Sequence, residues 1–274
     1  MTSSEKPAVV NAQEVKQCCA RLYESDIAKM LLGDSFHPGG LKLTERLGRS
    51  LQLTSTSRVL DVASGKGASA MFLAEQFGCV VIGIDYSKQN VEDANRESAA
   101  RGLKHLACFQ TADAERLPFP EGSFDAVVCE CAFCTFPEKG IVGCEFARVL
   151  RPGGRVGMSD LTRGSTLPKE LEGLLAWVAC IADAQPVDTY ARCLISAGLR
   201  LEATEPHDQA LQEMVRQIQT KLLGVEIMAG LKKIDIPGLD LTTAKQMAQA
   251  ALAAIRQGQL GYAIITARKP QVIG

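Results

Sequence analysis

The chain has 274 residues, of which 46% are hydrophobic, and carries a formal net charge of −1. This size suits one large α/β core with additions, and the scattered, balanced charges argue against a nucleic-acid-binding surface. No apolar run reaches the roughly 20 residues of a membrane span and the polar N-terminus is unlike a secretory signal, so we expect a cytoplasmic protein without a membrane segment.

Two helices are expected before the first strand. Apolar side chains recur at helical spacing from Ala12 to Leu32, Gly33 ends that pattern, and a second amphipathic helix is predicted from Leu41 to Leu51. His37 lies in the turn between them. We expect this leader, residues 1–52, to pack beside or over a ligand crevice of the domain that follows, residues 53–274.

A strand, a glycine turn, a helix and a second strand follow. The apolar run Val59 to Ala63 breaks into Gly65-Lys66-Gly67, and a second apolar run extends from Cys79 to Ile84. Glycine suits a backbone that presses against a nucleotide, and the next helix points free N–H groups at the ligand. Asp85, at the end of the second strand, can accept hydrogen bonds from a ribose. Gly65-x-Gly67-x-x-Ala70 formally also matches the dinucleotide fingerprint.

Strands and helices continue to alternate after this unit. Since such alternation is typical of parallel sheets covered on both faces, we predict a doubly wound α/β fold. The stretch from His207 to Gly258 has helical spacing, and we expect it to form a cap or a homodimer surface. Further strands are predicted at residues 107–111, 124–131, 155–161, 199–204 and 261–267.

Five landmarks in order carry a family resemblance over about residues 57–161. They resemble the class I S-adenosylmethionine-dependent methyltransferases, which implies a seven-stranded Rossmann-like sheet whose last strand is antiparallel. One departure is Ala63, where that family usually has glycine, so we expect a slightly tighter pocket. The landmarks are Asp61 to Gly67, Asp85, Ala112-Asp113-Ala114, Leu117-Pro118-Phe119 with Ser123-Phe124-Asp125, and Leu150 to Gly154.

The same resemblance implies how S-adenosylmethionine binds. The glycines should face its methionine part, Asp85 its ribose, and Asp113 with Ala114 its adenine, although a turn-capping role for Asp113 is the plain alternative. The cofactor-binding residues expected are Asp61, Ala63, Gly65, Gly67, Asp85, Tyr86, Asp113, Ala114 and Cys129.

Ten cysteines are many for a chain that we expect in a reducing compartment, where disulfides are rare. Cys129, Cys131 and Cys134 follow the fourth strand, at the edge where open α/β sheets place ligands. Strand alternation predicts that Cys129 and Cys131 share a face and that Glu130 points to the other.

This arrangement is similar to the arsenite methyltransferase branch of the family. That branch has a metalloid-binding cysteine just after strand four, and the resemblance aligns Cys131 with it. A second such cysteine lies in the helix after strand five, and Cys180, in Trp177-x-x-Cys180, aligns with it. Cys18 or Cys19 could supply a third thiol. Thiolates suit a trivalent metalloid, whose lone pair would attack the methyl group.

Other interpretations stay open at this point. Cys131 and Cys180 are alternatively buried packing residues. The acceptor is alternatively carbon, oxygen or nitrogen of a small organic molecule, in which case a general base such as Glu130, His37 or His207 is needed. A third possibility is a module that binds S-adenosylmethionine without catalysis.

Overall fold

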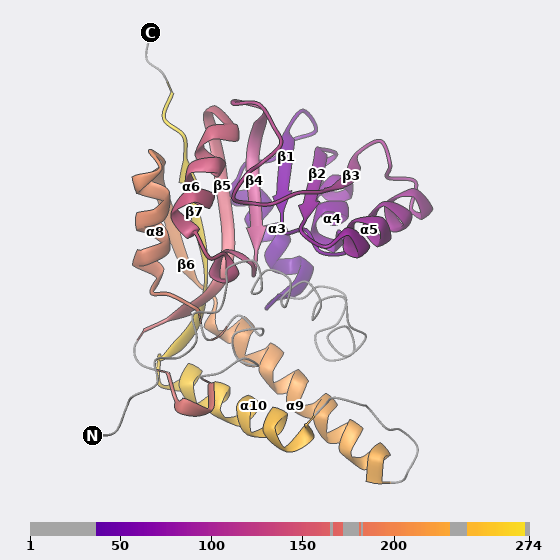
Figure 1. Ribbon diagram of the computed structural model, residues 1–274, viewed down its shortest axis with the longest axis vertical. Helices are drawn as coiled ribbons and strands as arrows, with labels where there is room; N and C mark the ends of the chain where they lie inside the picture. The colour runs from indigo at the N-terminus through magenta and orange to yellow at the C-terminus, as the bar shows by residue number, and fades with distance from the viewer. Residues whose placement is uncertain (1–36, 165–166, 172–180, 182, 231–239, 272–274) are drawn as a thin grey trace, which may run out of the picture.

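The computed structural model describes residues 37–164, 167–171, 181, 183–230 and 240–271. Within them lies a seven-stranded sheet of order β3-β2-β1-β4-β5-β7-β6 (Figure 1). β7 is antiparallel to both neighbours, and the other pairs are parallel, which confirms the predicted fold. The strands are β1 (Arg58–Val62), β2 (Val80–Asp85), β3 (Ala107–Thr111), β4 (Phe124–Glu130), β5 (Leu150–Arg163), β6 (Arg200–Pro206) and β7 (Leu260–Arg268).

Helices cover both faces of the sheet. On one face α3 packs against α4 and β5, while α4 and α5 pack against β2 and β3. On the other face α6 packs against β5 and α8. Right-handed crossovers require this division, because the chain winds outward from β1 in two opposite directions. The helices are α3 (Gly40–Ser50), α4 (Ala68–Phe77), α5 (Lys88–Ala100), α6 (Lys139–Val149) and α8 (Val187–Ser196), with the short 3₁₀ turns η1 (Phe133–Thr135) and η2 (Lys169–Leu171).

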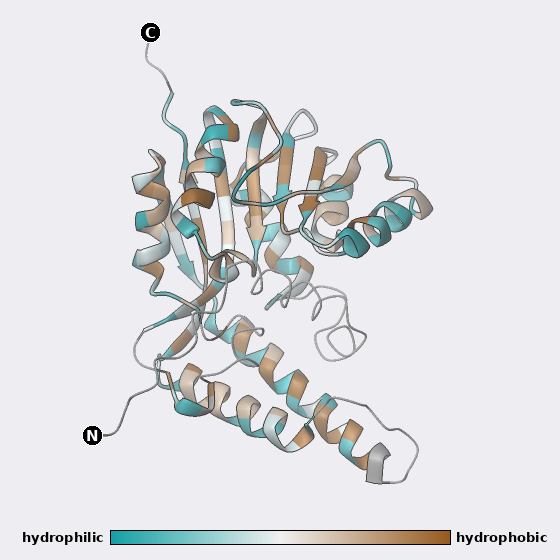
Figure 2. Cartoon of the chain, in the orientation of Figure 1, coloured by the Kyte–Doolittle hydropathy of each residue, from teal (hydrophilic) through white to brown (hydrophobic). Residues whose placement is uncertain are grey.

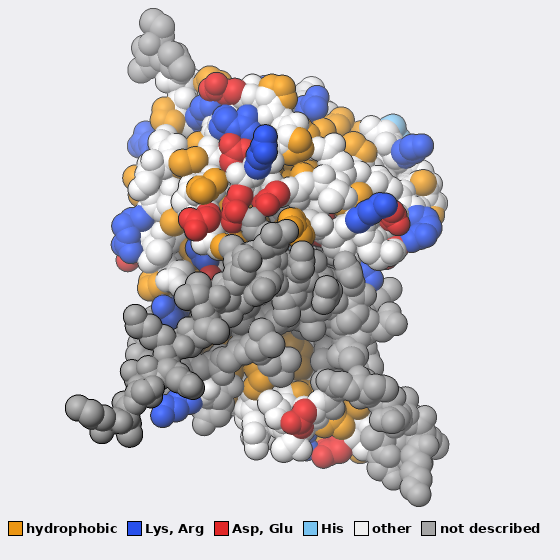
Figure 3. Space-filling model, viewed as in Figure 1, with side chains coloured by type: hydrophobic (Ala, Val, Ile, Leu, Met, Phe, Trp, Pro, Cys, Tyr) orange, Lys and Arg blue, Asp and Glu red, His pale blue; other side chains and the backbone are white. Residues whose placement is uncertain are grey.

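The central strands are apolar because they are buried on both faces. Figure 2 shows hydrophobic residues along the sheet and hydrophilic residues on the outer sides of the helices. Close approach of α3 depends on Gly157 of β5, since a Cβ there would lie 2.7 Å from Leu47. On the face that Figure 3 shows, basic and acidic side chains are mixed over the sheet domain.

Several strand boundaries differ from the predictions, most of them by one or two residues, and two differences matter for the site. β4 ends at Glu130, one residue early. β5 begins at Leu150 and includes the glycine turn, because Gly153 N–H donates to Lys269 O and Lys269 N–H donates to Gly154 O. Both corrections come from pairing with strands that are distant in sequence, which no local pattern reports.

Two long helices separate β6 from β7. α9 (Asp208–Gly230) and α10 (Leu241–Arg256) pack side by side and project from the sheet (Figure 1). Asp240 caps α10 by accepting hydrogen bonds from the N–H groups of Thr242 and Thr243. The predicted helical insertion is therefore present, although its break at 234–239 lies outside the described residues. Whether it is a cap or a dimer surface stays a prediction, and so does the division of the chain at residue 53. No helix among the described residues has the length and apolarity to span a bilayer.

Candidate functional site

The glycine turn between β1 and α4 has the backbone that the sequence predicts. Gly65 and Gly67 have φ of 54° and 81°, in the left-handed region that favours glycine. A Cβ on Gly67 would lie 2.5 Å from the Phe109 ring, whereas one on Gly65 would meet nothing within 4 Å. Gly67 is therefore needed for packing beneath the turn, and Gly65 leaves open space above it.

Asp85 ties this turn to β2. One of its carboxylate oxygens accepts a 2.8 Å hydrogen bond from Gly65 N–H, and the other accepts one of 2.8 Å from Ser87 N–H. Ser87 caps α5, as predicted, by accepting a hydrogen bond from Asn90 N–H. The carboxylate thus shapes the turn in addition to the ribose contact that the sequence predicts for it.

Buried polar atoms without partners surround the same turn. Among the described residues, Asp61 Oδ2, Ser64 Oγ and Asn90 Oδ1 are buried and lack a hydrogen-bond partner. Buried polar groups are normally satisfied, so such a group of orphans indicates a missing polar ligand. The atoms comprise two acceptors and a hydroxyl, which fits the ammonium and hydroxyl groups of an aminoacyl nucleoside such as S-adenosylmethionine.

The charge of this region also favours a cationic ligand. Burial raises the pKa of Asp61 well above its ordinary value, and the nearby carboxylates of Glu130 and Asp85 raise it further. A positive ligand would relieve this repulsion. S-adenosylmethionine has a sulfonium and an ammonium, so its charge matches these acids.

A row of polar side chains crosses five adjacent strands on one face of the sheet. Asp61 of β1 pairs with Gly83 of β2 and with Val128 of β4. Asp85 lies two residues after Gly83, and Glu130 lies two residues after Val128. Since side chains two residues apart in a strand point to the same face, the three acids share a face of the sheet. Glu130 pairs with Ser159, whose partner Ile264 lies two residues from Tyr262. We call this set the polar row: Asp85, Asp61, Glu130, Ser159 and Tyr262.

Glu130 is the centre of a buried hydrogen-bond network. Thr44 Oγ1 of α3 donates to its two carboxylate oxygens at 3.0 and 3.3 Å, and Ser159 Oγ donates at 3.4 Å. His37 Nε2 lies 3.5 Å from Glu130 Oε2, and these two side chains are only 5% and 4% exposed. A carboxylate and an imidazole thus meet in a largely dehydrated place beside Asp61.

Two residues other than glycine at this edge have left-handed backbone. Ala63, directly after β1, has φ of 59°, and Cys131, directly after β4, has φ of 54°. Such residues cost free energy and tend to persist at functional sites. Cys131 N–H donates a 2.7 Å hydrogen bond to Ser159 O, and its side chain is half-buried against the core.

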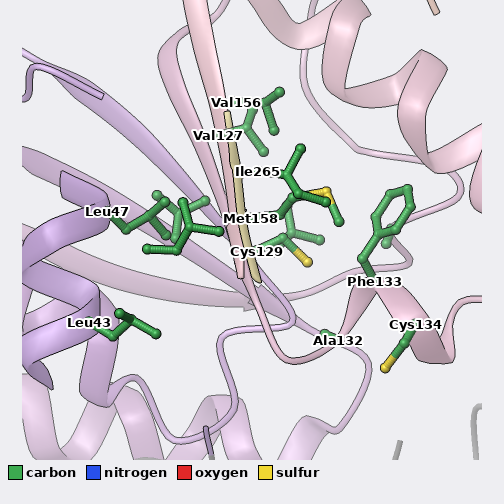
Figure 4. Close-up of a cluster of buried hydrophobic side chains, with 14 of the residues drawn as sticks. Leu43, Leu47, Val127, Cys129, Ala132, Phe133, Cys134, Val156, Met158 and Ile265 are labelled. Atoms are coloured by element: carbon green, nitrogen blue, oxygen red, sulfur yellow. The ribbon is translucent and has the colours of Figure 1, made fainter. Parts of the chain in front are cut away.

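The opposite face of β4 and β5 is apolar. Cys129 is fully buried near Met158 and Phe133, as Figure 4 shows, and burial raises the pKa of its thiol. The expectation that Cys129 and Cys131 share a face does not hold, because β4 ends at Glu130 and Cys131 leaves the strand in a left-handed conformation. Glu130 does point away from Cys129, as alternation predicts.

The remaining predicted residues are placed as follows. Asp113 Oδ1 accepts a 3.0 Å hydrogen bond from Glu115 N–H, so it caps the turn after β3. Ala114 is buried beside it, and Tyr86 is exposed at the end of β2. His207 lies 3.7 Å from Glu205, directly before α9. Cys180, Trp177, Cys18 and Cys19 lie outside the described residues.

Three members of the Glu130 network escaped the sequence analysis. Thr44, Ser159 and Tyr262 come from α3, β5 and β7, and no local motif connects them. The available signal was polarity in otherwise apolar strands. Ser159 and Asp160 interrupt β5, and a buried polar residue normally has a specific partner.

Comparisons with known proteins agree with this geometry. Residues 60–158 match the family model described as "Methyltransferase domain". The O-methyltransferase cnsE of Penicillium expansum is 30% identical, over 84% of this chain and 78% of the relative. The 27-O-demethylrifamycin SV methyltransferase of Amycolatopsis mediterranei is 28% identical, over 90% and 94%. An arsenite methyltransferase of Halobacterium salinarum is 31% identical, over 56% of this chain and 40% of that protein.

Among solved structures, a Haemonchus contortus phosphoethanolamine N-methyltransferase in complex with S-adenosyl-L-methionine has a TM-score of 0.79. It shares 18% identity, over 97% of this chain and 62% of that one, which shows the fold. The glycine turn, the acids beside it and the full-length relatives agree on the cofactor. The chain belongs to the class I S-adenosylmethionine-dependent methyltransferases and acts on a small acceptor.

Proposed function

We propose that this enzyme methylates a hydroxyl group of a small organic molecule, with Glu130 and His37 as a general-base pair. The observation that carries the proposal is the 3.5 Å approach of His37 Nε2 to Glu130 Oε2 at the carboxyl end of β4. A neutral hydroxyl is a poor nucleophile, so its methylation requires a group that takes the proton.

The hydrogen bonds of His37 identify the atom that can take this proton. Nδ1 lies 3.3 Å from Pro38 O, and because a carbonyl only accepts, Nδ1 carries the hydrogen. In the neutral imidazole Nε2 then holds the lone pair, and the hydroxyls of Thr44 and Ser69 lie 3.3 and 3.4 Å from it. When Nε2 gains a proton, the Glu130 carboxylate beside it stabilises the positive charge, which is the usual division of labour in a carboxylate–histidine pair.

The bound cofactor supplies an electrophilic methyl group on a positively charged sulfur. The protein's part is to bind the acceptor, hold its hydroxyl in line with that methyl group and remove its proton. The acceptor O–H bond breaks as the proton passes to the pair, and the oxygen's electron pair forms the new O–CH₃ bond. S-adenosylhomocysteine leaves as the other product.

Cofactor contacts are part of the proposal. Asp61 and Ser64 receive the methionine end above Gly65, Asp85 receives the ribose, and the turn at Asp113 and Ala114 receives the adenine. The orphan atoms of Asp61 and Ser64 support the first of these. Ala63, Gly67 and Tyr86 line the cofactor pocket. Cys129 supports the pocket only through packing, because it is buried on the opposite face of β4.

Two full-length relatives support hydroxyl as the acceptor, since their names describe O-methylation. The test is transfer of labelled methyl groups to a panel of phenols and alcohols by the wild type, Glu130→Gln and His37→Gln. We expect the rate to fall about 10²- to 10⁴-fold in both variants. Glu75→Gln is a control, because Glu75 is an exposed carboxylate that pairs with Arg101 at 2.8 Å and belongs to neither the polar row nor α3. Undiminished transfer by Glu130→Gln would refute the general-base role.

A second candidate acceptor is a thiol-bound trivalent metalloid, held by Cys131 and Cys180 with Cys18 or Cys19. The specific support is Cys131, a half-buried thiol kept in a left-handed conformation at the ligand edge of the sheet. The partial similarity to an arsenite methyltransferase adds to it. Among the described residues no group of three His, Cys, Asp or Glu side chains is arranged to hold a metal ion.

The two acceptors are separated by incubation with arsenite and a thiol in place of the phenols. Methylated arsenic that disappears in Cys131→Ser and Cys180→Ser would establish the metalloid reaction. Activity on a phenol that survives both substitutions would establish the hydroxyl reaction.

A further inference from the structure

Two members of the polar row, Ser159 and Tyr262, have no role in the cofactor contacts or the general-base pair as described so far. Tyr262 of β7 and Ser159 of β5 are fully buried, although both are polar. Tyr262 OH donates a 2.9 Å hydrogen bond to Ser159 Oγ, and Ser159 Oγ donates at 3.4 Å to Glu130 Oε1. These bonds form a line across three strands that ends on the carboxylate.

Tyr262 determines which groups donate and which accept in this chain of hydrogen bonds. Burial, together with the neighbouring Cys131 and Glu130, raises the pKa of Tyr262, so its hydroxyl stays protonated and can act as a donor. Because Ser159 Oγ accepts from Tyr262, its own hydrogen is available for Glu130. The two hydroxyls therefore donate in sequence, and the second hydrogen bond fixes the orientation of the carboxylate.

Thr44 completes the arrangement from the helix above. Its hydroxyl donates to both oxygens of Glu130, so the carboxylate is held from α3 on one side and from β5 on the other. The titratable groups beside Glu130 on its own face of the sheet, in the described part of the chain, are His37, Asp61 and Tyr262.

We infer that Tyr262 and Ser159 are positioning residues that orient the Glu130 carboxylate toward His37. The inference rests on the proposed function, since it explains how the general-base pair is held in place. It also explains two fully buried hydroxyls in β5 and β7, where packing alone would favour hydrocarbon.

The test measures kcat and KM for methyl transfer to the acceptor that the panel identifies, in the wild type, Ser159→Ala and Tyr262→Phe. Because these residues act on the orientation of Glu130 and not on acceptor binding, we expect kcat to fall about 10-fold in Ser159→Ala and about 3-fold in Tyr262→Phe, with KM nearly unchanged. In a Glu130→Gln background the same substitutions should cause no further loss. Tyr190→Phe is the matched control, because Tyr190 is also fully buried but donates to Leu161 O.

The outcomes separate this inference from the proposed function. An unchanged kcat in both Ser159→Ala and Tyr262→Phe, or an equal loss in Tyr190→Phe, overturns the positioning role. A loss of kcat that is confined to Ser159→Ala and Tyr262→Phe and disappears in the Glu130→Gln background supports it. Failure of the general-base role appears elsewhere, as undiminished methyl transfer by Glu130→Gln.

Discussion

The two faces of the sheet differ sharply at the carboxyl ends of the same strands. On the α6 and α8 side, Cys129 and Met158 are buried among aromatic rings. On the α3 and α4 side, the next residues, Glu130 and Ser159, belong to a hydrogen-bonded row. A step of one residue along a strand thus separates packing from chemistry, because successive side chains point to opposite faces.

The apolar face should determine stability. Phe133 is fully buried, and its ring centroid lies 5.9 Å from that of Phe146 and 5.7 Å from that of Tyr190. Phe133→Ala should lower the free energy of unfolding by about 3–5 kcal/mol, measured by urea denaturation. Affinity for S-adenosylmethionine under native conditions should change little. A large loss of affinity in a still folded variant would show that the two faces are not separate.

The polar face should determine cofactor binding. Asp85→Ala removes an acceptor from Gly65 N–H and Ser87 N–H as well as the predicted ribose contact. We expect calorimetry to show binding of S-adenosylmethionine weaker by roughly 1.5–3 kcal/mol. Glu92→Ala on α5 is the control, because Glu92 is exposed and pairs only with Lys88 among the ion pairs of the described residues. Unchanged affinity in Asp85→Ala would contradict the placement of the ribose.

The pH dependence of stability tests the polar face at Asp61. Because its pKa in the folded protein is above 3.8, the folded state holds the extra proton, and stability falls as pH rises through the folded-state pKa. Asp61→Asn should therefore be more stable than the wild type at pH 8 without cofactor, and this advantage should disappear at low pH. Thermal unfolding measured across pH checks this. Equal stability of Asp61→Asn and the wild type at all pH values would mean that burial and the neighbouring carboxylates do not destabilise the charged form of Asp61.

Saturating cofactor provides the complementary measurement for the same variant. Wild-type protein should gain more stability from S-adenosylmethionine than Asp61→Asn does, because the ligand compensates the carboxylate charge. An equal gain in both proteins would place the ligand's positive charges elsewhere.

The smallest expected effect concerns the backbone where the two faces meet. Ala63 has φ of 59°, so Ala63→Gly should raise the free energy of unfolding, by up to about 1 kcal/mol. Ala99→Gly, in the regular helix α5, should instead lower it by a similar amount. A destabilised Ala63→Gly variant would show that the methyl group packs favourably enough to offset its conformation.

The fold was predictable because its signals are local. Apolar runs located the strands, and the glycine turn, Asp85 and Ser87 follow from short motifs whose geometry the structure reproduces. The network around Glu130 was not predictable, because it needs the register between β4, β5 and β7 and the docking of α3. Cys131 shows the limit of a local rule. Alternation fails there because the strand ends one residue earlier than its apolar pattern.

The insertion between β6 and β7 has a further consequence. These strands are antiparallel neighbours at one margin of the sheet, so α9 and α10 leave and rejoin it at nearly the same place, away from β1 and β2. The far ends of the two helices can therefore be lengthened or shortened without displacing β1 and β2, whereas the first turn of α9 lies against Gly39 at the start of α3. Chimeras that swap these far ends between related enzymes would use this modularity.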